Sequence, residues 1–291
     1  MYINELFKNK KSVFSLEVFP PKKDGGIKSL YSALDALKQL APDFISVTYG
    51  AGASAADMST IEISSHIKHS LGIEPLAHLT CVASSKQLVK ERINQLKEAD
   101  IQNILALRGD KNPNIPCVHD FEHASDLVRE IRKNGTFNIV GACYPEGHYE
   151  NKTLETDIDN LKYKIGEGVT HLITQLFFDN DLFMRFLETA QKRGVTVPVQ
   201  AGIMPIVNSR QIERTVALSG ASLPPKFTKM INKYSDNADA LFEAGIQYAS
   251  VTAVIGISPS FVKGKLAGCE NCVLREKCDF KRCGFNPAGT K

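Results

Sequence analysis

The sequence lacks several features that would place a protein in a class at once. No uninterrupted apolar run approaches the roughly 18 residues of a membrane-spanning helix, and the amino-terminal segment has no apolar signal-peptide core. Lys and Arg number 35 against 32 Asp and Glu, a net charge of +3, and no basic stripe is interleaved with aromatic residues. We therefore expect a soluble, cytoplasmic protein that binds neither a membrane nor nucleic acid.

Common motifs of nucleotide binding and nucleophilic catalysis are missing as well. No Gly-x-Gly-x-x-Gly follows the first predicted strand, which argues against a Rossmann domain, and there is no P-loop and no Gly-x-Ser-x-Gly elbow. The histidines and acids of the first 250 residues are too scattered to predict a zinc or di-iron site. Any chemistry must therefore rest on a different arrangement of polar groups.

What the sequence does contain is an alternation of strand and helix patterns from residue 12 to about residue 250. The four apolar residues Ile104–Leu107 predict a strand buried on both faces, and the chain then breaks into Arg108, Gly109 and Asp110. The expected strands are 13–19, 44–48, 76–80, 104–107, 138–143, 172–174 and 199–203. This series favours an α/β fold, a (β/α)₈ TIM barrel, over a doubly wound sheet.

The predicted organisation is a barrel over residues 1–257 followed by a short Cys-rich tail over residues 258–291. The eighth strand is expected to be atypical or missing. Val251–Ile255 is apolar and rich in β-branched residues, so it is the expected substitute for that strand.

Polar side chains stand at or near the carboxyl end of most predicted strands. They are Glu17, Thr48, His78, Arg108 with Asp110, Tyr144 with His148, and Gln175. In a barrel these ends meet at one mouth, and the set predicts a site for a large organic cofactor with one acid. The alternative for any single member is a structural role, as for a hydrogen-bonded core histidine at His78.

Several of these segments resemble one enzyme family, methylenetetrahydrofolate reductase, in order and approximate spacing. The segments are Phe14–Pro21, Ser46–Ala51, His78–Cys81, Leu105–Asp110, Tyr144–Glu146 and Ile173–Asp179. The resemblance covers about residues 1–250. It implies an FAD-containing barrel that reduces 5,10-methylenetetrahydrofolate to 5-methyltetrahydrofolate. The family's usual eighth strand, with a His-x-Tyr-Thr-x-Asn motif, and its final helix have no counterpart here.

The resemblance implies two catalytic carboxylates. Glu17, flanked by apolar residues that would raise its pKa, is the implied general acid for opening the folate ring. Asp110 is the implied carboxylate beside flavin and pterin, where it would stabilise a cationic folate intermediate. The alternative for Asp110 is a strand-end salt bridge with Arg108.

Binding positions carry over residue by residue. The implied cofactor contacts are Thr48, Tyr49, Ala51, His78, Arg108, Gly109, Asp110, Ala124, Tyr144, His148, Asp157, Asn160 and Lys164. The implied substrate contacts are Asp110, Gln175 and Gln211. The electron donor is left open among NADH, NADPH and a partner protein, and a homo-oligomer is compatible with the sequence.

The tail carries four closely spaced cysteines: Cys269, Cys272, Cys278 and Cys283. It resembles the cysteine-rich ends of proteins related to the reactivation domain of cobalamin-dependent methionine synthase. The spacing predicts Zn²⁺ or an iron–sulfur cluster, with four free thiols as the alternative. A second functional hypothesis follows, in which the barrel is catalytically impaired and binds a metal or a partner through this tail.

Overall fold

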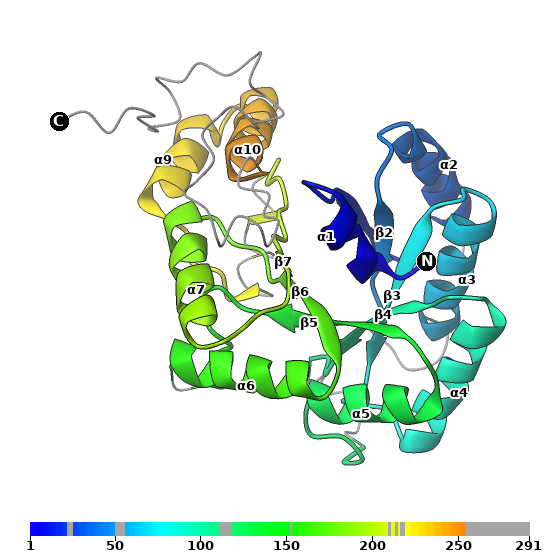
Figure 1. Cartoon of the computed structure of the whole chain (residues 1–291). Helices are drawn as coiled ribbons and strands as arrows, with labels where there is room; N and C mark the ends of the chain where they lie inside the picture. Colours follow the sequence, from blue (N-terminus) through cyan, green and yellow to red (C-terminus); the bar gives the residue numbers. More distant parts are fainter. Residues whose placement is uncertain are drawn as a thin grey trace. The chain divides into compact units, whose positions relative to one another are not determined.

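The computed structural model describes residues 1–21, 26–49, 56–110, 118–151, 153–208, 211, 212, 215 and 219–253 (Figure 1). Strands and helices alternate along them. The strands are β1 (Ser15–Val18), β2 (Phe44–Val47), β3 (Glu74–Thr80), β4 (Asn103–Leu107), β5 (Asn138–Cys143), β6 (Val169–Thr174) and β7 (Val199–Gln200). The helices are α1 (Leu6–Asn9, after the 3₁₀ turn Ile3–Glu5), α2 (Gly26–Lys38), α3 (Ala56–His69), α4 (Lys86–Glu98), α5 (Ala124–Asn134), α6 (Leu154–Gly166), α7 (Asn180–Lys192), α9 (Pro225–Tyr234) and α10 (Ala238–Ala253).

The strands form one sheet in which spatial order follows chain order, β1-β2-β3-β4-β5-β6-β7. The ladders from β1 to β5 are parallel. Parallel neighbours in sequence order, each joined by a crossover helix, are the arrangement of a (β/α)₈ barrel. The expected α/β, TIM-barrel-like fold is therefore confirmed, and the sheet of the described residues ends at β7.

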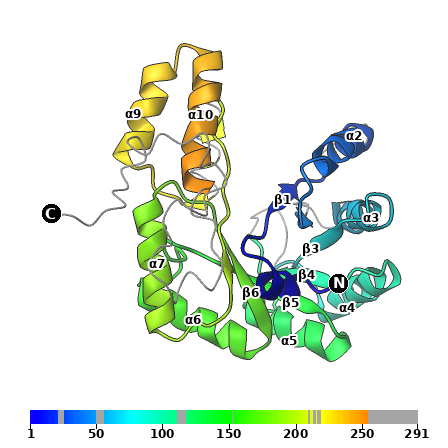
Figure 2. The ribbon, with the colours of Figure 1, turned by 45° about the horizontal axis from the view of Figure 1, so that its top comes forward.

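The helices of the first half cover one side of their strands because alternate strand residues on that side are apolar. Val18, Ile45 and Val47 pack in a single cluster with Leu34 of α2 and Ile63 of α3. Figures 1 and 2 show α2, α3 and α4 along this side of the sheet, with α1 on the other side. The alternate side chains of β1–β3 point to the opposite side, which therefore can present polar groups.

A buried hydrogen-bond network ties the amino-terminal segment to the starts of the strands. The Asn103 side-chain oxygen accepts from the backbone N–H of Ile3 at 2.9 Å and from the Asn138 amide at 3.0 Å. The Asn103 amide donates to the Met1 carbonyl at 3.1 Å and to the Glu74 carboxylate at 3.3 Å. Because buried amides are costly without partners, these bonds fix the amino ends of β3, β4 and β5.

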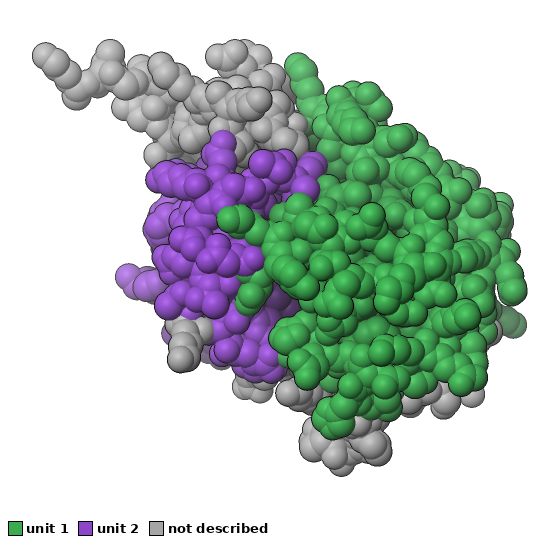
Figure 3. Space-filling view, turned by 60° about the horizontal axis from the view of Figure 1, so that its bottom comes forward, with its two compact units in different colours: residues 1–142, 160–172 green, residues 143–159, 173–291 purple. Residues whose placement is uncertain are grey.

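Two compact units make up the chain, coloured separately in Figure 3. Unit 1 comprises residues 1–142 and 160–172, and unit 2 comprises residues 143–159 and 173–291. The core of unit 2 contains Phe178 stacked on Phe227 at 4.5 Å, with Tyr248 edge-on to Phe227 at 4.8 Å. The Tyr248 hydroxyl donates to the Phe178 carbonyl at 2.7 Å, so its polar tip is satisfied within this apolar cluster.

The expected eighth strand over Val251–Ile255 is wrong where the structure describes it. Residues 251–253 continue α10, and residues 254 and 255 lie outside the described residues. Leu241, Gly245 and Ala249 recur every four residues and are the buried side of α10. This packing extends the helix over residues whose local preference is for a strand. The proposed boundary at residue 257 and the tail beyond it also lie outside the described residues, so the two-part organisation stays a prediction.

No helix of the described chain is both long and apolar enough to cross a membrane.

Candidate active site

Three polar side chains meet on one face of the sheet, at the carboxyl ends of β1, β2 and β3. The register pairs Glu17 with Ser46 directly, so both side chains point to the same face. Ser46 in turn pairs with Leu76, which places His78, two residues further along β3, on that face as well. The Ser46 hydroxyl lies 2.6 Å from His78 Nε2, and Glu17 Oε2 lies 3.6 Å from the same nitrogen.

The electrostatics of this cluster favour a neutral histidine and a weakened acid. His78 is 7% exposed, and its burial lowers the pKa to about 3, so the ring is uncharged near neutral pH. Desolvation by the surrounding protein raises the pKa of Glu17, and a hydrogen bond from Ser46 partly opposes that rise. The Glu17 side chain keeps 45% of its surface exposed, so a reactant can reach the carboxyl and water still screens it. The cluster is suited to proton transfer.

The end of β4 turns sharply through Gly109, whose φ is +85°. The carbonyl of Arg108 accepts from the backbone N–H groups of Cys81 at 3.1 Å and Val82 at 2.8 Å. These bonds fix the turn against the segment after β3, and Asp110 follows it with its side chain exposed. Three of the predicted site residues, Arg108, Gly109 and Asp110, therefore occupy a fixed turn at the carboxyl end of β4.

Thr48 is held at the carboxyl end of β2 by its backbone. Its N–H donates to the Val18 carbonyl at 3.0 Å, and its own carbonyl accepts from the Thr60 hydroxyl of α3 at 3.0 Å. Tyr49 follows it, partly buried, and Ala51 lies outside the described residues.

The remaining predicted positions of unit 1 lie on helices. Lys164 of α6 donates to the Ala142 carbonyl at 2.8 Å, which holds its ammonium group beside the carboxyl end of β5. Asn160 precedes it by one helical turn, on the same face of α6. Ala124 is the first residue of α5.

In unit 2, three predicted cofactor contacts lie in the loop after β5 or at the start of α6. They are Tyr144, His148 and Asp157. The Tyr144 and His148 rings meet edge-to-face with centroids 4.8 Å apart, and His148 stacks on Tyr149 at 4.5 Å. Asp157, at the start of α6, is 5% exposed and accepts a hydrogen bond of 2.5 Å from the Asn151 amide. The loop is thus braced by its own side chains.

The two predicted substrate-binding glutamines are engaged with nearby backbone. The Gln175 side-chain oxygen accepts from the N–H of Leu176 at 3.0 Å. The Gln211 amide donates to the Pro205 carbonyl at 3.1 Å, and its oxygen accepts from the N–H of Val207 at 3.0 Å. Both ends of the Gln211 amide therefore brace the segment after β7, and a ligand bound there would have to compete for these groups.

Sequence reasoning missed Ser46, which contacts two of the predicted residues. Its signal was available, because it is the single hydroxyl in the otherwise apolar strand Phe44–Val47 and is buried there at 3% exposure. No group of three or more His, Cys, Asp or Glu side chains suited to a metal occurs among the described residues. The four tail cysteines lie outside them, so the expected zinc or iron–sulfur site stays a prediction without support.

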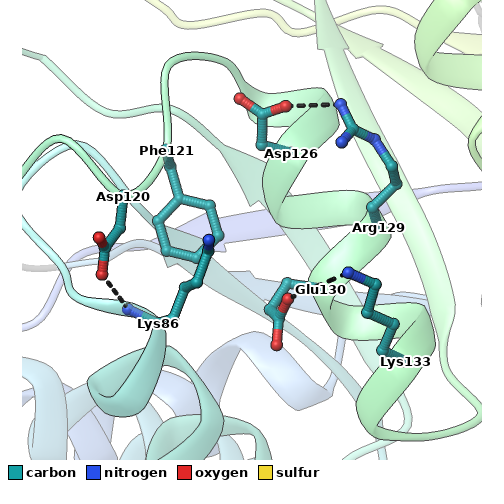
Figure 4. Close-up of a pocket in the computed structure, with 7 residues that line it drawn as sticks. All are labelled: Lys86, Asp120, Phe121, Asp126, Arg129, Glu130 and Lys133. Atoms are coloured by element: carbon teal, nitrogen blue, oxygen red, sulfur yellow. Dashed lines mark hydrogen bonds and ion pairs between the residues drawn. The ribbon is translucent and has the colours of Figure 1, made fainter.

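A separate pocket opens between the start of α4 and the length of α5 (Figure 4). Its lining carries three basic and three acidic side chains, several of which have partners within the pocket. Arg129 and Asp126 form an ion pair of 2.6 Å, and the Asp120 carboxylate accepts from the backbone N–H of Lys86 at 2.9 Å. This pairing leaves the pocket without a concentration of one charge, and Glu17 is not among its lining residues.

Comparison with known proteins gives a consistent result. Residues 2–260 match the family model described as methylenetetrahydrofolate reductase. The 5,10-methylenetetrahydrofolate reductase of Buchnera aphidicola is 38% identical over 210 residues, 72% of this chain and 70% of that protein. The probable methylenetetrahydrofolate reductase (NADH) of Oryza sativa is 35% identical over 259 residues, 84% of this chain. That alignment covers only 43% of the rice protein, so the chain spans less than half of its length.

Among solved structures, one described as an uncharacterized protein from Clostridium thermocellum that binds two copies of 5-methyl-5,6,7,8-tetrahydrofolic acid has a similar fold. Its TM-score is 0.60 at 13% sequence identity, covering 84% of this chain and 85% of that one. At this identity the likeness concerns the fold alone.

Proposed function

This chain belongs to the methylenetetrahydrofolate reductase family, and we propose that it reduces 5,10-methylenetetrahydrofolate to 5-methyltetrahydrofolate with FAD as its cofactor. The observation that carries the proposal is the cluster of Glu17, Ser46 and His78 in unit 1. The reaction needs an acid that is protonated near neutral pH, because a folate nitrogen is a poor leaving group until it gains a proton. Desolvation that raises the pKa of Glu17, beside a His78 ring that burial keeps neutral, supports that role.

Glu17 acts as the general acid in this proposal. Its partly exposed carboxyl delivers a proton to the folate nitrogen, and the five-membered ring opens to a cationic iminium. Asp110, on the fixed turn after β4, stabilises that positive charge as a preorganised anion. Bound FAD, once reduced by the electron donor, would supply the hydride that this cation accepts.

The residue types of unit 1 fit a flavin dinucleotide. Lys164 and Asn160 on one face of α6 offer a cation and an amide for the phosphate and ribityl groups. Thr48, His78 and Arg108 offer further hydrogen-bonding groups at strand ends. The cofactor and substrate positions carried over elsewhere in the chain stay predictions, and those on Tyr144, His148, Asp157, Gln175 and Gln211 belong to unit 2.

The electron donor in the proposal is NADH. The rice, Arabidopsis thaliana and maize relatives carry NADH in their names, and this supports the choice over NADPH.

Half-reactions followed by rapid mixing test the proposed function. The purified protein should be yellow, release FAD on denaturation and lose its absorbance near the flavin maximum when NADH is added without oxygen. Methylenetetrahydrofolate should then restore that absorbance and appear as 5-methyltetrahydrofolate. A protein that is reconstituted with FAD yet shows neither step would overturn the proposal and favour the binding-protein hypothesis.

A further inference from the structure

Ser46 contacts both of the ionisable groups in the cluster. Its hydroxyl lies 2.6 Å from His78 Nε2 and is hydrogen-bonded to the Glu17 carboxyl, whereas Glu17 and His78 are separated by 3.6 Å. Among the described residues, His78 on β3 is the ionisable side chain in contact with Glu17, and β2 contributes the uncharged Ser46. Among the described residues, the Ser46 hydroxyl is therefore the group that is hydrogen-bonded to both Glu17 and His78.

Hydrogen-bond accounting fixes the direction of the chain of bonds. A serine hydroxyl has one proton to donate and two lone pairs, and a neutral imidazole carries one proton on one of its two nitrogens. If Nε2 of His78 lacked its proton, the Ser46 proton would be drawn to it and a Glu17 carboxylate would be left without a donor. If Nε2 carries the proton, it donates to Ser46 Oγ, and Ser46 donates to Glu17. Only the second arrangement satisfies all three groups when Glu17 is ionised.

We propose that Ser46 is a positioning residue that relays a hydrogen bond from His78 to Glu17 and so tunes Glu17 as the proton donor for folate reduction. The proposal rests on the proposed function, since it assigns Ser46 a part in the reaction that Glu17 performs. Ser46 is not expected to touch the folate, because 97% of its surface is buried (3% exposed).

The relay has a definite effect on the acid. Desolvation raises the pKa of Glu17, and the Ser46 hydroxyl opposes that rise because its hydrogen bond favours the charged carboxylate. His78 adds no positive charge, since burial lowers its pKa to about 3. Ser46 is therefore the group that keeps Glu17 from becoming too weak an acid to give up its proton. When the proton has left, the same hydroxyl stabilises the carboxylate.

The test is the pH dependence of flavin reoxidation by methylenetetrahydrofolate, measured by rapid mixing on the NADH-reduced protein. This rate falls as Glu17 loses its proton, so the alkaline limb of the pH–rate profile reports the pKa of Glu17. In Ser46→Ala the limb should move upward by about one pH unit, because a lost hydrogen bond to a charged group is worth roughly that much. Ser46→Thr keeps the hydroxyl and should return the limb to its original position. The rate of flavin reduction by NADH should not change in either variant.

A matched control removes another buried hydroxyl from the same unit. Ser64 of α3 is fully buried and its hydroxyl has no hydrogen-bond partner among the described residues. Ser64→Ala should leave the alkaline limb in place. If the Ser46→Ala protein does not fold, Ser46→Cys, whose thiol is a weak donor, should move the limb in the same direction.

The outcomes distinguish failure of the Ser46 relay from failure of Glu17 as the general acid. An alkaline limb in Ser46→Ala that coincides with that of the parent protein overturns the relay while leaving Glu17 as the acid. A shift of equal size in Ser64→Ala also overturns it, since the effect would then be a general response to a lost hydroxyl. Full folate reduction by Glu17→Gln overturns the acid assignment itself, and the relay falls with it.

Discussion

His171 lies against Phe7 in the interior of unit 1, with ring centroids 4.9 Å apart and the ring planes tilted by 48°. The His171 side chain is fully buried, and neither ring nitrogen has a hydrogen-bond partner among the described residues. Burial lowers the pKa of His171 to about 3, against 6.5 for a free side chain. The folded protein therefore holds this imidazole neutral, beside a helix that is anchored through Ile3.

That arrangement makes stability depend on pH. Below about pH 6.5 His171 is protonated in the unfolded chain, whereas in the folded protein it stays neutral down to about pH 3. The free energy of unfolding therefore falls as pH falls through this window. His171→Leu removes this term and should reduce the slope of unfolding free energy by up to about 1.4 kcal/mol per pH unit. At pH 7 the variant should be as stable as the parent or more so, since no hydrogen bond is lost.

Urea denaturation between pH 5 and pH 8 measures this slope. His119→Gln, which changes an exposed histidine, is the control and should leave it unchanged. An identical slope in parent and His171→Leu proteins would mean that the folded protein binds a proton at His171 as readily as the unfolded chain does.

Glu17→Gln should separate the two half-reactions. The amide keeps the shape of the carboxyl but cannot deliver a proton, so flavin reoxidation by methylenetetrahydrofolate should slow by about 10²–10⁴-fold. Flavin content and reduction by NADH should be nearly unaffected, because neither step needs that proton. In the parent protein, folate reduction should decline as pH rises through the raised pKa of Glu17. Normal folate turnover by the variant would remove Glu17 from the mechanism.

Asp110→Asn should alter both half-reactions, in opposite directions. A carboxylate close to the flavin would oppose the negative charge of its reduced form, so removing it should speed reduction by NADH. The same carboxylate would stabilise the cationic folate intermediate, so its removal should slow reoxidation. Unchanged rates in both steps would return Asp110 to a structural role at the end of β4, such as an ion pair with Arg108.

Gly109→Ala tests how tightly the turn after β4 is built. The φ of +85° strains any other residue, and an added Cβ would lie 3.1 Å from Thr80 Cβ and 3.3 Å from Val82 Cγ1. Gly72 also has a positive φ, +72°, but open space around it. We expect Gly109→Ala to cost about 2–3 kcal/mol and Gly72→Ala about 1–2 kcal/mol, by urea denaturation at pH 7. Equal costs would show that Thr80 and Val82 yield to the new methyl group.

The sequence predicts those features of the fold and site that depend on local patterns, and it misses those that depend on strand register. The strand β5 was predicted with its observed bounds, Asn138–Cys143, because an apolar run between turn signals is a local pattern. The carboxyl ends of parallel strands share one edge, so Glu17 and His78 could be expected to be near each other. Their shared partner Ser46 was missed, because its role appears only once the register of β1, β2 and β3 is known.

The same reasoning explains the error at the end of the chain. Val251 and its neighbours have the composition of a strand, but the helix before them continues because its buried face packs in unit 2. Tertiary packing of this kind outweighs a β-propensity that spans about 1 kcal/mol in total. By contrast, α9 had a local signal that was not used, with Pro225 at its start and Phe227, Met230 and Ile231 at helical spacing.

The packing of α10 can be tested at Gly245. An added Cβ there would overlap the carbonyl oxygen of Ile206, a backbone atom that cannot move as a side chain can. Gly245→Ala should therefore destabilise unit 2 by about 2–3 kcal/mol. Gly166→Ala, at the end of α6 with nothing within 4 Å, is the control and should be neutral or stabilising by up to about 1 kcal/mol. The measurement is hydrogen exchange of the α9 and α10 amides together with the melting temperature. If Gly245→Ala leaves both unchanged, α10 does not depend on its contact with Ile206, and our explanation for the helix extending over residues 251–253 fails.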